Sequence, residues 1–360
     1  MKKTNLNCFL PAFEDHSGHE NSYLKVYENF SKIKNYNVEL FVAKKNRIQT
    51  ILRKKNVFLK NNSFFLFKFV NIFRNLIVIS RINRLYNKET IFLLDGYSFY
   101  FLLSFTLSLN NFRKFKKLII FCRYNYKGFQ RIIFKFFLYI LNVKFINCIL
   151  ITDNDLNYKI FKKKFKKNNI RYFPTPFFYK KKNKKILKNI KKNILCPGQY
   201  RVEKFGKNLT DFLEQNKKSK IQVSISKKFH NLIFGKIKFK KFDENLEKEK
   251  YFELIKKNSI IILPYDEKLY KYRTSGIFFE SIQYDKLVFV TNNTWFSREL
   301  KKFELNELII NDWSKFNLDK KLSELQLMKV RKKLALMKKK YLQFHNQNNF
   351  VKLLKKTCEK

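Results

Sequence analysis

Cysteine is scarce in this sequence, and its placement excludes the common metal and disulfide arrangements. The five cysteines are far apart and form neither a CxxC pair nor a Cys/His cluster with metal-ligand spacing. No GxxxxGK[ST] phosphate loop, zinc pattern or internal repeat is present either. Free cysteines in apolar runs behave as small hydrophobic residues, so a reducing cytoplasm is the simplest compartment for the chain.

Long uninterrupted apolar segments are also missing, which argues against a membrane-spanning helix. The segment Phe64–Ile79 is broken by Lys68 and Arg74, each costly at the centre of a span. Ile91–Leu109 has only Asp95 charged, but an Asp-Gly pair after a short apolar run predicts the end of a buried strand followed by a buried helix. The start of the chain has too short an apolar run for a signal peptide and predicts a first strand.

Acidic residues are few relative to basic ones. The 28 Asp and Glu stand against 78 Lys and Arg, so the formal net charge is +50 and the pI is near 10.0. Such a charge implies affinity for polyanions, whether nucleic acid, an anionic membrane or a phosphorylated substrate. The sign of the charge does not choose among them, and A/T-rich codon usage would produce the same excess of Lys, Phe, Ile and Asn.

What is present is an alternation of strands and helices, which predicts the α/β class with parallel sheets. The 45% hydrophobic content of 360 residues is enough for two cores. We predict strands at residues 6–10, 37–43, 91–94, 117–122, 146–152, 193–197, 220–226, 236–242, 259–263, 286–291 and 308–310, with helices in the basic and aromatic region 47–87. Two prolines and a lysine run after residue 170 mark a boundary between compact units.

The stretch Ser259–Trp295 contains the strongest candidate for a site. It predicts a strand, a polar loop, a helix and a second strand. A helix that begins near Thr274, Ser275 and Gly276 offers backbone amides that favour phosphate, and Arg273 adds a positive charge. Glu280 then lies on the same helix face, one turn or ~6 Å further along. The alternative is a surface loop followed by an ordinary amphipathic helix with a solvated Glu280.

This stretch resembles the nucleotide-sugar-binding segment of GT-B glycosyltransferases of the family 4-like group. Glu280 falls on the family's ribose-binding Glu. In the loop after the strand at 193–197, Gly198, Arg201, Glu203, Lys204 and Gly206 echo the pattern in which a basic pair grips the donor diphosphate. Tyr272 departs from the family, which often has an acidic residue there. That departure puts a catalytic carboxylate at this position in doubt.

The resemblance implies two facing Rossmann-like domains with a C-terminal helix crossing back. Residues 1–176 would bind the acceptor, 177–345 the nucleotide sugar, and 346–360 would pack on the first domain. The implied reaction moves a sugar from a UDP- or GDP-linked donor to a hydroxyl of a glycan or lipid-linked acceptor, with no cofactor and no metal, in cell-surface polysaccharide or glycolipid synthesis. The implied roles are diphosphate binding by Arg201, Lys204, Arg273, Thr274, Ser275 and Gly276, ribose binding by Glu280, and acceptor or donor contacts by the loop with Gly18 and His19.

Several alternatives stay open. His19 is a weak candidate for a catalytic base, against a loop histidine that is merely solvated. Asp153-Asn154-Asp155 matches the metal-binding DxD of GT-A glycosyltransferases, or else caps a helix. The basic charge fits a peripheral protein on the inner membrane face. The alternative function is noncatalytic nucleic-acid binding, although no RNA-binding motif is present and no nucleic-acid partner is expected.

Overall fold

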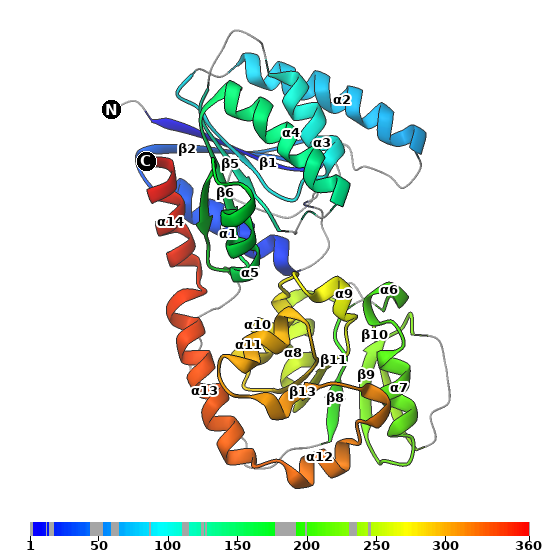
Figure 1. Ribbon diagram of the computed structural model, residues 1–360. Coiled ribbons are helices and arrows are strands. Elements are labelled where there is room, and N and C mark those ends of the chain that lie inside the picture. Colours follow the sequence, from blue (N-terminus) through cyan, green and yellow to red (C-terminus); the bar gives the residue numbers. More distant parts are fainter. Residues whose placement is uncertain are drawn as a thin grey trace. The chain divides into compact units, whose positions relative to one another are not determined.

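The chain divides into two compact units (Figure 1). Unit 1 comprises Met1–Pro176 and Gln347–Lys360, and unit 2 comprises Phe177–Asn346. The computed structural model describes residues 3–11, 13, 18–43, 53–58, 65–85, 88–109, 115–123, 126, 128–176, 192–198, 200–229, 236–243 and 246–359. Over these ranges no helix combines the length and the apolar character that crossing a bilayer requires.

Unit 1 is built on a seven-stranded sheet in which all neighbouring strands are parallel. Its spatial order is β3-β2-β1-β4-β5-β6-β7. The chain therefore moves outward in one direction from β1 and then restarts at β4 in the other, which is the Rossmann order. The strands are β1 (Thr4–Leu10), β2 (Tyr36–Ala43), β3 (Arg53–Phe58), β4 (Ile91–Leu94), β5 (Phe115–Phe121), β6 (Phe145–Thr152) and β7 (Asn169–Tyr172).

Helices cover both faces of this sheet, because its central strands are apolar on both sides. One face packs against α2 (Phe65–Arg84), α3 (Phe99–Ser108), α4 (Gly128–Lys144) and α5 (Asp155–Lys164), which share a core with Phe9 and Phe92. The other face holds α1 (Gly18–Ser31) and α14 (Gln347–Glu359), which contact each other. Tyr23 of α1 stacks edge-on against Phe350 of α14 at 5.8 Å.

Unit 2 repeats the same order with six parallel strands, β10-β9-β8-β11-β12-β13. The strands are β8 (Asn193–Leu195), β9 (Gln222–Ser226), β10 (Lys238–Phe242), β11 (Ile260–Leu263), β12 (Leu287–Thr291) and β13 (Ile309–Ile310). The helices are α6 (Val202–Phe205), α7 (Asn208–Gln215), α8 (Lys248–Lys257), α9 (Glu267–Tyr270), α10 (Gly276–Gln283), α11 (Trp295–Lys301), α12 (Leu318–Glu324) and α13 (Leu327–Phe344), with short 3-10 turns η1 (Asn306–Leu308) and η2 (Trp313–Lys315).

The predicted α/β class and the two Rossmann-like sheets are confirmed. Ile91–Leu109 forms a buried strand and helix, β4 and α3, as expected. The helices predicted in region 47–87 include α2, but the strand β3 at Arg53–Phe58 was not predicted. This strand pairs only with β2, at the edge of the sheet. An edge strand needs no continuous apolar run, and lysines are common at edges, so the sequence RKKNVF did not reveal it.

Candidate functional site

The candidate site lies where unit 2 changes direction. β8 and β11 are neighbours at the centre of the sheet, and the chain leaves them toward opposite edges. In open α/β sheets ligands bind at this switch point, beyond the carboxyl ends of the strands. The loop after β8 carries Gly198 and leads into α6, which carries Lys204, and the segment after β11 leads through α9 to α10. The two segments that the sequence singled out therefore meet at one edge of the sheet.

Gly198 makes this meeting possible. Its φ is +87°, a conformation that L side chains rarely adopt. A Cβ at this position would lie 2.9 Å from Nζ of Lys204 and 3.3 Å from Cδ1 of Ile277. Ile277 belongs to the first turn of α10, so the ammonium of Lys204 and the start of α10 both approach the same glycine.

Lys204 is fixed by its surroundings although it carries a charge. The residue is 6% exposed, and its ammonium lies 4.3 Å from the ring centroid of Tyr265 and 4.9 Å from that of Phe205. The backbone amide of Asp266 donates to the carbonyl of Lys204 at 2.8 Å, joining α6 to the segment after β11. Burial raises the pKa of the nearby Cys196 to about 12, and the charge of Lys204 partly opposes this rise. Lys204 thus presents a positioned positive charge at the switch point.

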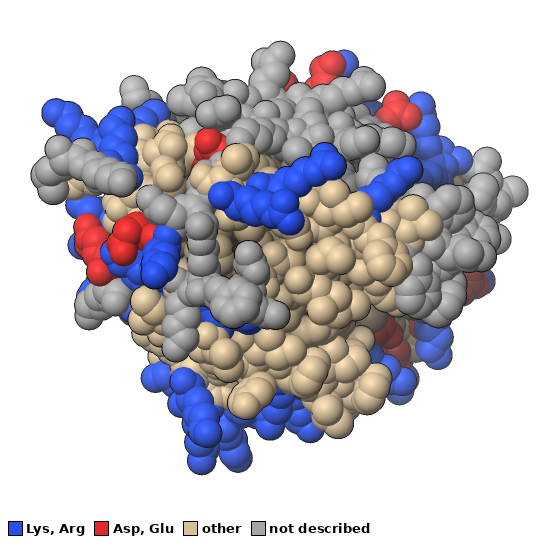
Figure 2. Space-filling model, turned by 90° about the horizontal axis from the view of Figure 1, so that it is seen from above, with Lys and Arg blue, Asp and Glu red and all other residues tan. Residues whose placement is uncertain are grey.

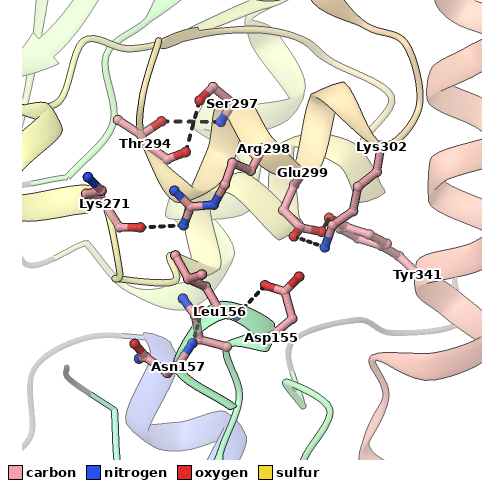
Figure 3. Close-up of polar contacts among 11 residues, drawn as sticks. Asp155, Leu156, Asn157, Lys271, Thr294, Ser297, Arg298, Glu299, Lys302 and Tyr341 are labelled. Atoms are coloured by element: carbon pink, nitrogen blue, oxygen red, sulfur yellow. Dashed lines mark hydrogen bonds and ion pairs between the residues drawn. The ribbon is translucent and has the colours of Figure 1, made fainter. Parts of the chain in front are cut away.

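The start of α10 is held by α11. Arg298 of α11 donates a hydrogen bond to the carbonyl of Lys271, in the loop that precedes α10 (Figure 3). α11 is itself capped by Thr294, whose hydroxyl accepts from the amide of Ser297 at 3.3 Å. Ser275 is the N-cap residue of α10, but its hydroxyl makes no capping hydrogen bond. The first-turn amides of α10 therefore receive no cap from this side chain.

Glu280 lies inside the protein and is not the solvated surface residue of the alternative interpretation. It is 8% exposed, and its carboxylate accepts a hydrogen bond of 2.6 Å from the hydroxyl of Tyr251 on α8. Burial, followed by the charge of Glu280, raises the pKa of Tyr251 well above its usual value, so this hydroxyl stays a donor. The hydrogen bond gives the carboxylate a fixed direction.

The other predicted residues differ in how far the structure defines them. Arg201 is exposed, and its Nε lies 3.9 Å from a carboxylate oxygen of Glu203, while Arg273 is exposed and Thr274 half-buried. Gly276 is buried at the first position of α10. Gly18 and His19 open α1 in unit 1, but their side chains lie outside the described residues. The structure thus brings Gly198, Lys204 and the start of α10 together, and it leaves the role of His19 untested.

Unit 1 contains a charged cluster that the sequence did not reveal. Arg123, just after β5, makes two hydrogen bonds of 2.8 and 2.7 Å to the carboxylate of Asp95, just after β4. It also lies 3.8 Å from the carboxylate of Asp153, which follows β6. The hydroxyl of Tyr23 donates to Asp153 at 3.0 Å, and that of Tyr27 donates to Asp95 at 3.2 Å. Three strand ends are therefore tied together by one guanidinium.

The two carboxylates are buried and Arg123 is half-buried, and this shifts the ionisation of the cluster. Burial alone would lower the pKa of Arg123, but Asp95 and then Tyr23 and Asp153 raise it well above its usual value. Burial raises the pKa of Asp153, opposed by Arg123 and by the hydrogen bond from Tyr23. Chain positions 95, 123 and 153 are too far apart to form a motif. Only their shared place at the ends of adjacent parallel strands could have suggested the contact.

The Asp153-Asn154-Asp155 triplet serves as a helix cap. The side chain of Asn154 accepts from the amides of Leu156 and Asn157 at 2.9 and 3.0 Å, and Asp155 accepts from Leu156 at 2.9 Å at the start of α5 (Figure 3). Asp153 points into the Arg123 cluster instead. Within the described residues, no group of three or more His, Cys, Asp or Glu side chains could hold a metal ion.

Neither the family models nor the curated protein sequences gave a match to this chain. Several solved structures, in contrast, are similar to it. The α,α-trehalose 6-phosphate synthase of Burkholderia multivorans superposes with a TM-score of 0.63 at 6% identity over 100% of this chain and 97% of its own. HepE of Anabaena, solved with UDP-glucose, gives 0.61 at 7% identity over 99% of both chains. A UDP-N-acetylglucosamine 2-epimerase described as putative, from Listeria monocytogenes, gives 0.55 at 11% identity over 98% and 94%. The chain therefore has the fold of the GT-B glycosyltransferases.

Proposed function

We propose that the protein is a glycosyltransferase that moves a sugar from a nucleoside-diphosphate donor to an acceptor hydroxyl. The observation that carries the proposal is the meeting of Lys204, Gly198 and the start of α10 at the switch point of unit 2. A positive charge beside helix-terminal amides is suited to a diphosphate. The fold likeness to HepE, solved with UDP-glucose, agrees with this ligand class.

In this proposal the diphosphate lies between Lys204 and the start of α10, with Arg201 and Arg273 adding charge from the surface. Negative charge grows on the leaving diphosphate in the transition state, so a fixed cation there lowers the barrier without a metal ion. Glu280 accepts hydrogen bonds from the ribose hydroxyls, oriented by Tyr251. Thr274, Ser275 and Gly276 contribute hydroxyl or amide donors to the same group. Whether the donor nucleotide is UDP or GDP is decided by the binding experiment below.

Binding of UDP and GDP by calorimetry tests the proposed site directly. Lys204→Met removes the charge, and a lost charge-assisted hydrogen bond of ~1.5–3 kcal/mol predicts ~10- to 150-fold weaker binding. Lys207→Met is the matched control, because Lys207 is exposed and only three residues along the same segment. Equal affinities in the two variants would place the diphosphate elsewhere. If neither nucleotide binds the parent protein, the transferase proposal fails.

An epimerase is the competing enzyme class, because one structure of the same fold carries that description. The two reactions have different products. A transferase releases nucleoside diphosphate in proportion to a sugar-bearing acceptor, whereas an epimerase changes the sugar without needing an acceptor. Separating the products from UDP-glucose and GDP-mannose, with and without acceptor glycans, distinguishes them. The nucleic-acid-binding alternative has no support in the fold or in the comparisons.

The finer parts of the proposal concern metal, acceptor and place. We propose a metal-independent reaction, with unchanged turnover in EDTA as its test. The acceptor is a glycan or lipid-linked sugar for cell-surface polysaccharide or glycolipid synthesis, on the cytoplasmic side and at the inner membrane face. The basic charge supports attraction to anionic lipid. If a soluble acceptor reacts as fast as a lipid-linked one, the proposed membrane location loses its support.

A further inference from the structure

The outward face of α4 is unusually apolar for a surface helix. Five large side chains are exposed along it, and Phe129 at 75% and Tyr139 at 72% are the most exposed. They recur at intervals of three and four residues, which at ~100° per residue keeps them within an arc of about 80°. The opposite side carries the buried core residues. The exposed stripe consists of Phe129, Ile132, Phe136, Tyr139 and Val143, and is called the α4 stripe below.

The helices beside α4 extend this surface. α2 and α4 each pack beside α3 over one core, and α2 exposes Val70, Phe73 and Ile77 at the same three-and-four spacing. Of the large hydrophobic residues exposed in the described chain, eleven lie in unit 1 and three in unit 2. The imbalance shows that the exposed apolar residues are concentrated in one unit. A concentration of exposed apolar side chains of this kind marks an interaction site.

The charges around the α4 stripe have one sign. The sequences of α2, α3 and α4 contain no Asp or Glu, whereas they contain seven Lys and Arg. Arg131 and Lys135 are on α4 itself, and Arg74 and Arg81 are exposed among the apolar residues of α2. Figure 2, which views the end where Figure 1 draws these helices, shows a broad area without charged residues, bordered mainly by Lys and Arg and at a few places by Asp or Glu.

We propose that the α4 stripe inserts into the interface of a lipid bilayer that contains anionic lipid. Aromatic and aliphatic side chains on one face, with flanking Lys and Arg, are the features of a helix that lies in a membrane surface. The stripe would enter the acyl boundary while Arg131 and Lys135 reach the headgroups. A second copy of the chain fits less well, because a symmetric pairing of this face would set its basic residues against one another. The inference extends the proposed membrane location, and its test needs no enzymatic activity.

The test is co-sedimentation of the full chain with vesicles of phosphatidylcholine, either alone or with about 30% phosphatidylglycerol to imitate an anionic leaflet. Ile132→Ser with Phe136→Ser should weaken binding to the anionic vesicles by at least ~10-fold. Met328→Ser with Leu336→Ser, also exposed but on α13 of unit 2, is the matched control and should bind like the parent. Arg131→Gln and Lys135→Gln should each weaken binding to the anionic vesicles roughly 5-fold, and this difference should shrink as the salt concentration rises.

A second readout reports insertion itself. The chain has two tryptophans, Trp295 and Trp313, both buried in unit 2. Phe136→Trp adds one on the α4 stripe, and its emission should shift to the blue and be quenched by brominated lipid when vesicles are added. No shift, no vesicle binding by the parent, or equal binding by the Ser double variant and its control would each overturn the proposal. Loss of a parent dimer in the same double variant, without vesicle binding, would assign the stripe to a second copy instead.

Discussion

Each unit places a basic side chain just beyond a strand at or next to its switch point, but the two cations have different neighbours. Arg123 of unit 1 is held by the buried carboxylates of Asp95 and Asp153. Lys204 of unit 2 lies over the rings of Tyr265 and Phe205. Lys204 also lies beside Gly198 and the first turn of α10, where the proposed diphosphate would bind, whereas the contacts of Arg123 tie three strand ends together. The carboxyl end of the sheet thus serves internal stability in unit 1 and, in our proposal, ligand binding in unit 2.

The largest expected effect comes from breaking the unit 1 cluster. Asp95→Asn keeps the shape but leaves the half-buried guanidinium of Arg123 without its main counter-charge, so unit 1 should lose roughly 3 kcal/mol of unfolding free energy. Denaturant unfolding followed by far-UV circular dichroism should show the loss. Tryptophan fluorescence, which reports unit 2 alone, should shift much less.

Glu89→Gln is the control for that experiment. Glu89 pairs with Lys116 at 2.6 Å, but both side chains are exposed to solvent, so its loss should leave the unfolding free energy almost unchanged. Equal stability losses in the two variants would mean that the Arg123 cluster is no more than a surface ion pair.

Tyr251→Phe tests whether Glu280 is oriented for a ligand. The change removes one hydrogen bond to a buried carboxylate, which predicts a loss of ~1.5–3 kcal/mol in unfolding free energy and weaker nucleotide binding. Glu280→Gln should weaken nucleotide binding ~10- to 150-fold. Calorimetry with UDP and GDP, beside melting curves, separates the two quantities. If both variants lose stability but bind nucleotide like the parent, Glu280 is structural.

Gly198→Ala would disturb the position of Lys204 without removing it. A Cβ there is strained by the positive φ and also meets the ammonium of Lys204. Gly128→Ala is the matched control, since Gly128 has φ +50° but nothing within 4 Å of its Cβ position. Both variants should lose ~1–2 kcal/mol of stability. Only Gly198→Ala should weaken nucleotide binding, by roughly 10-fold in calorimetry. Equal nucleotide affinities in the two variants would contradict the proposed position of Lys204.

The smallest effect concerns Lys286, a third buried cation. Burial lowers its pKa to about 8, opposed by Asp285, and its ammonium donates to the carbonyl of Lys256 at 2.9 Å. Between pH 8 and the unfolded pKa of ~10.4, the unfolded chain holds a proton that the folded chain has lost. Stability from this group therefore rises with pH in that window. The parent should gain about 1 kcal/mol relative to Lys286→Met between pH 8 and pH 9 in urea titrations. Parallel pH profiles would contradict the assignment.

How much the sequence predicted depended on whether the signal was local. Apolar runs such as 260–263 and 287–291 revealed buried strands, since a central parallel strand is apolar on both faces. Lys204 and Glu280 were singled out because short local patterns around them resemble a family motif, and their roles stay predictions. The Arg123 cluster was not, because its members meet only when three strands align. The α4 stripe was also missed, because an apolar helix looks the same in sequence whether one of its faces is covered or exposed.

The attachment of α14 to unit 1 has a consequence for the order in which the protein is made. Lys117 is buried on β5, and its ammonium donates to the carbonyls of Thr357 and Cys358 at 2.9 and 2.5 Å. Domains generally fold in the order in which the ribosome releases them. Here the first unit to be synthesised acquires these contacts only after residue 358 has emerged, when all of unit 2 has already been translated. The contacts between Lys117 and α14 therefore form last. Until then Lys117 lacks these two acceptors, while unit 2 is able to complete its own contacts.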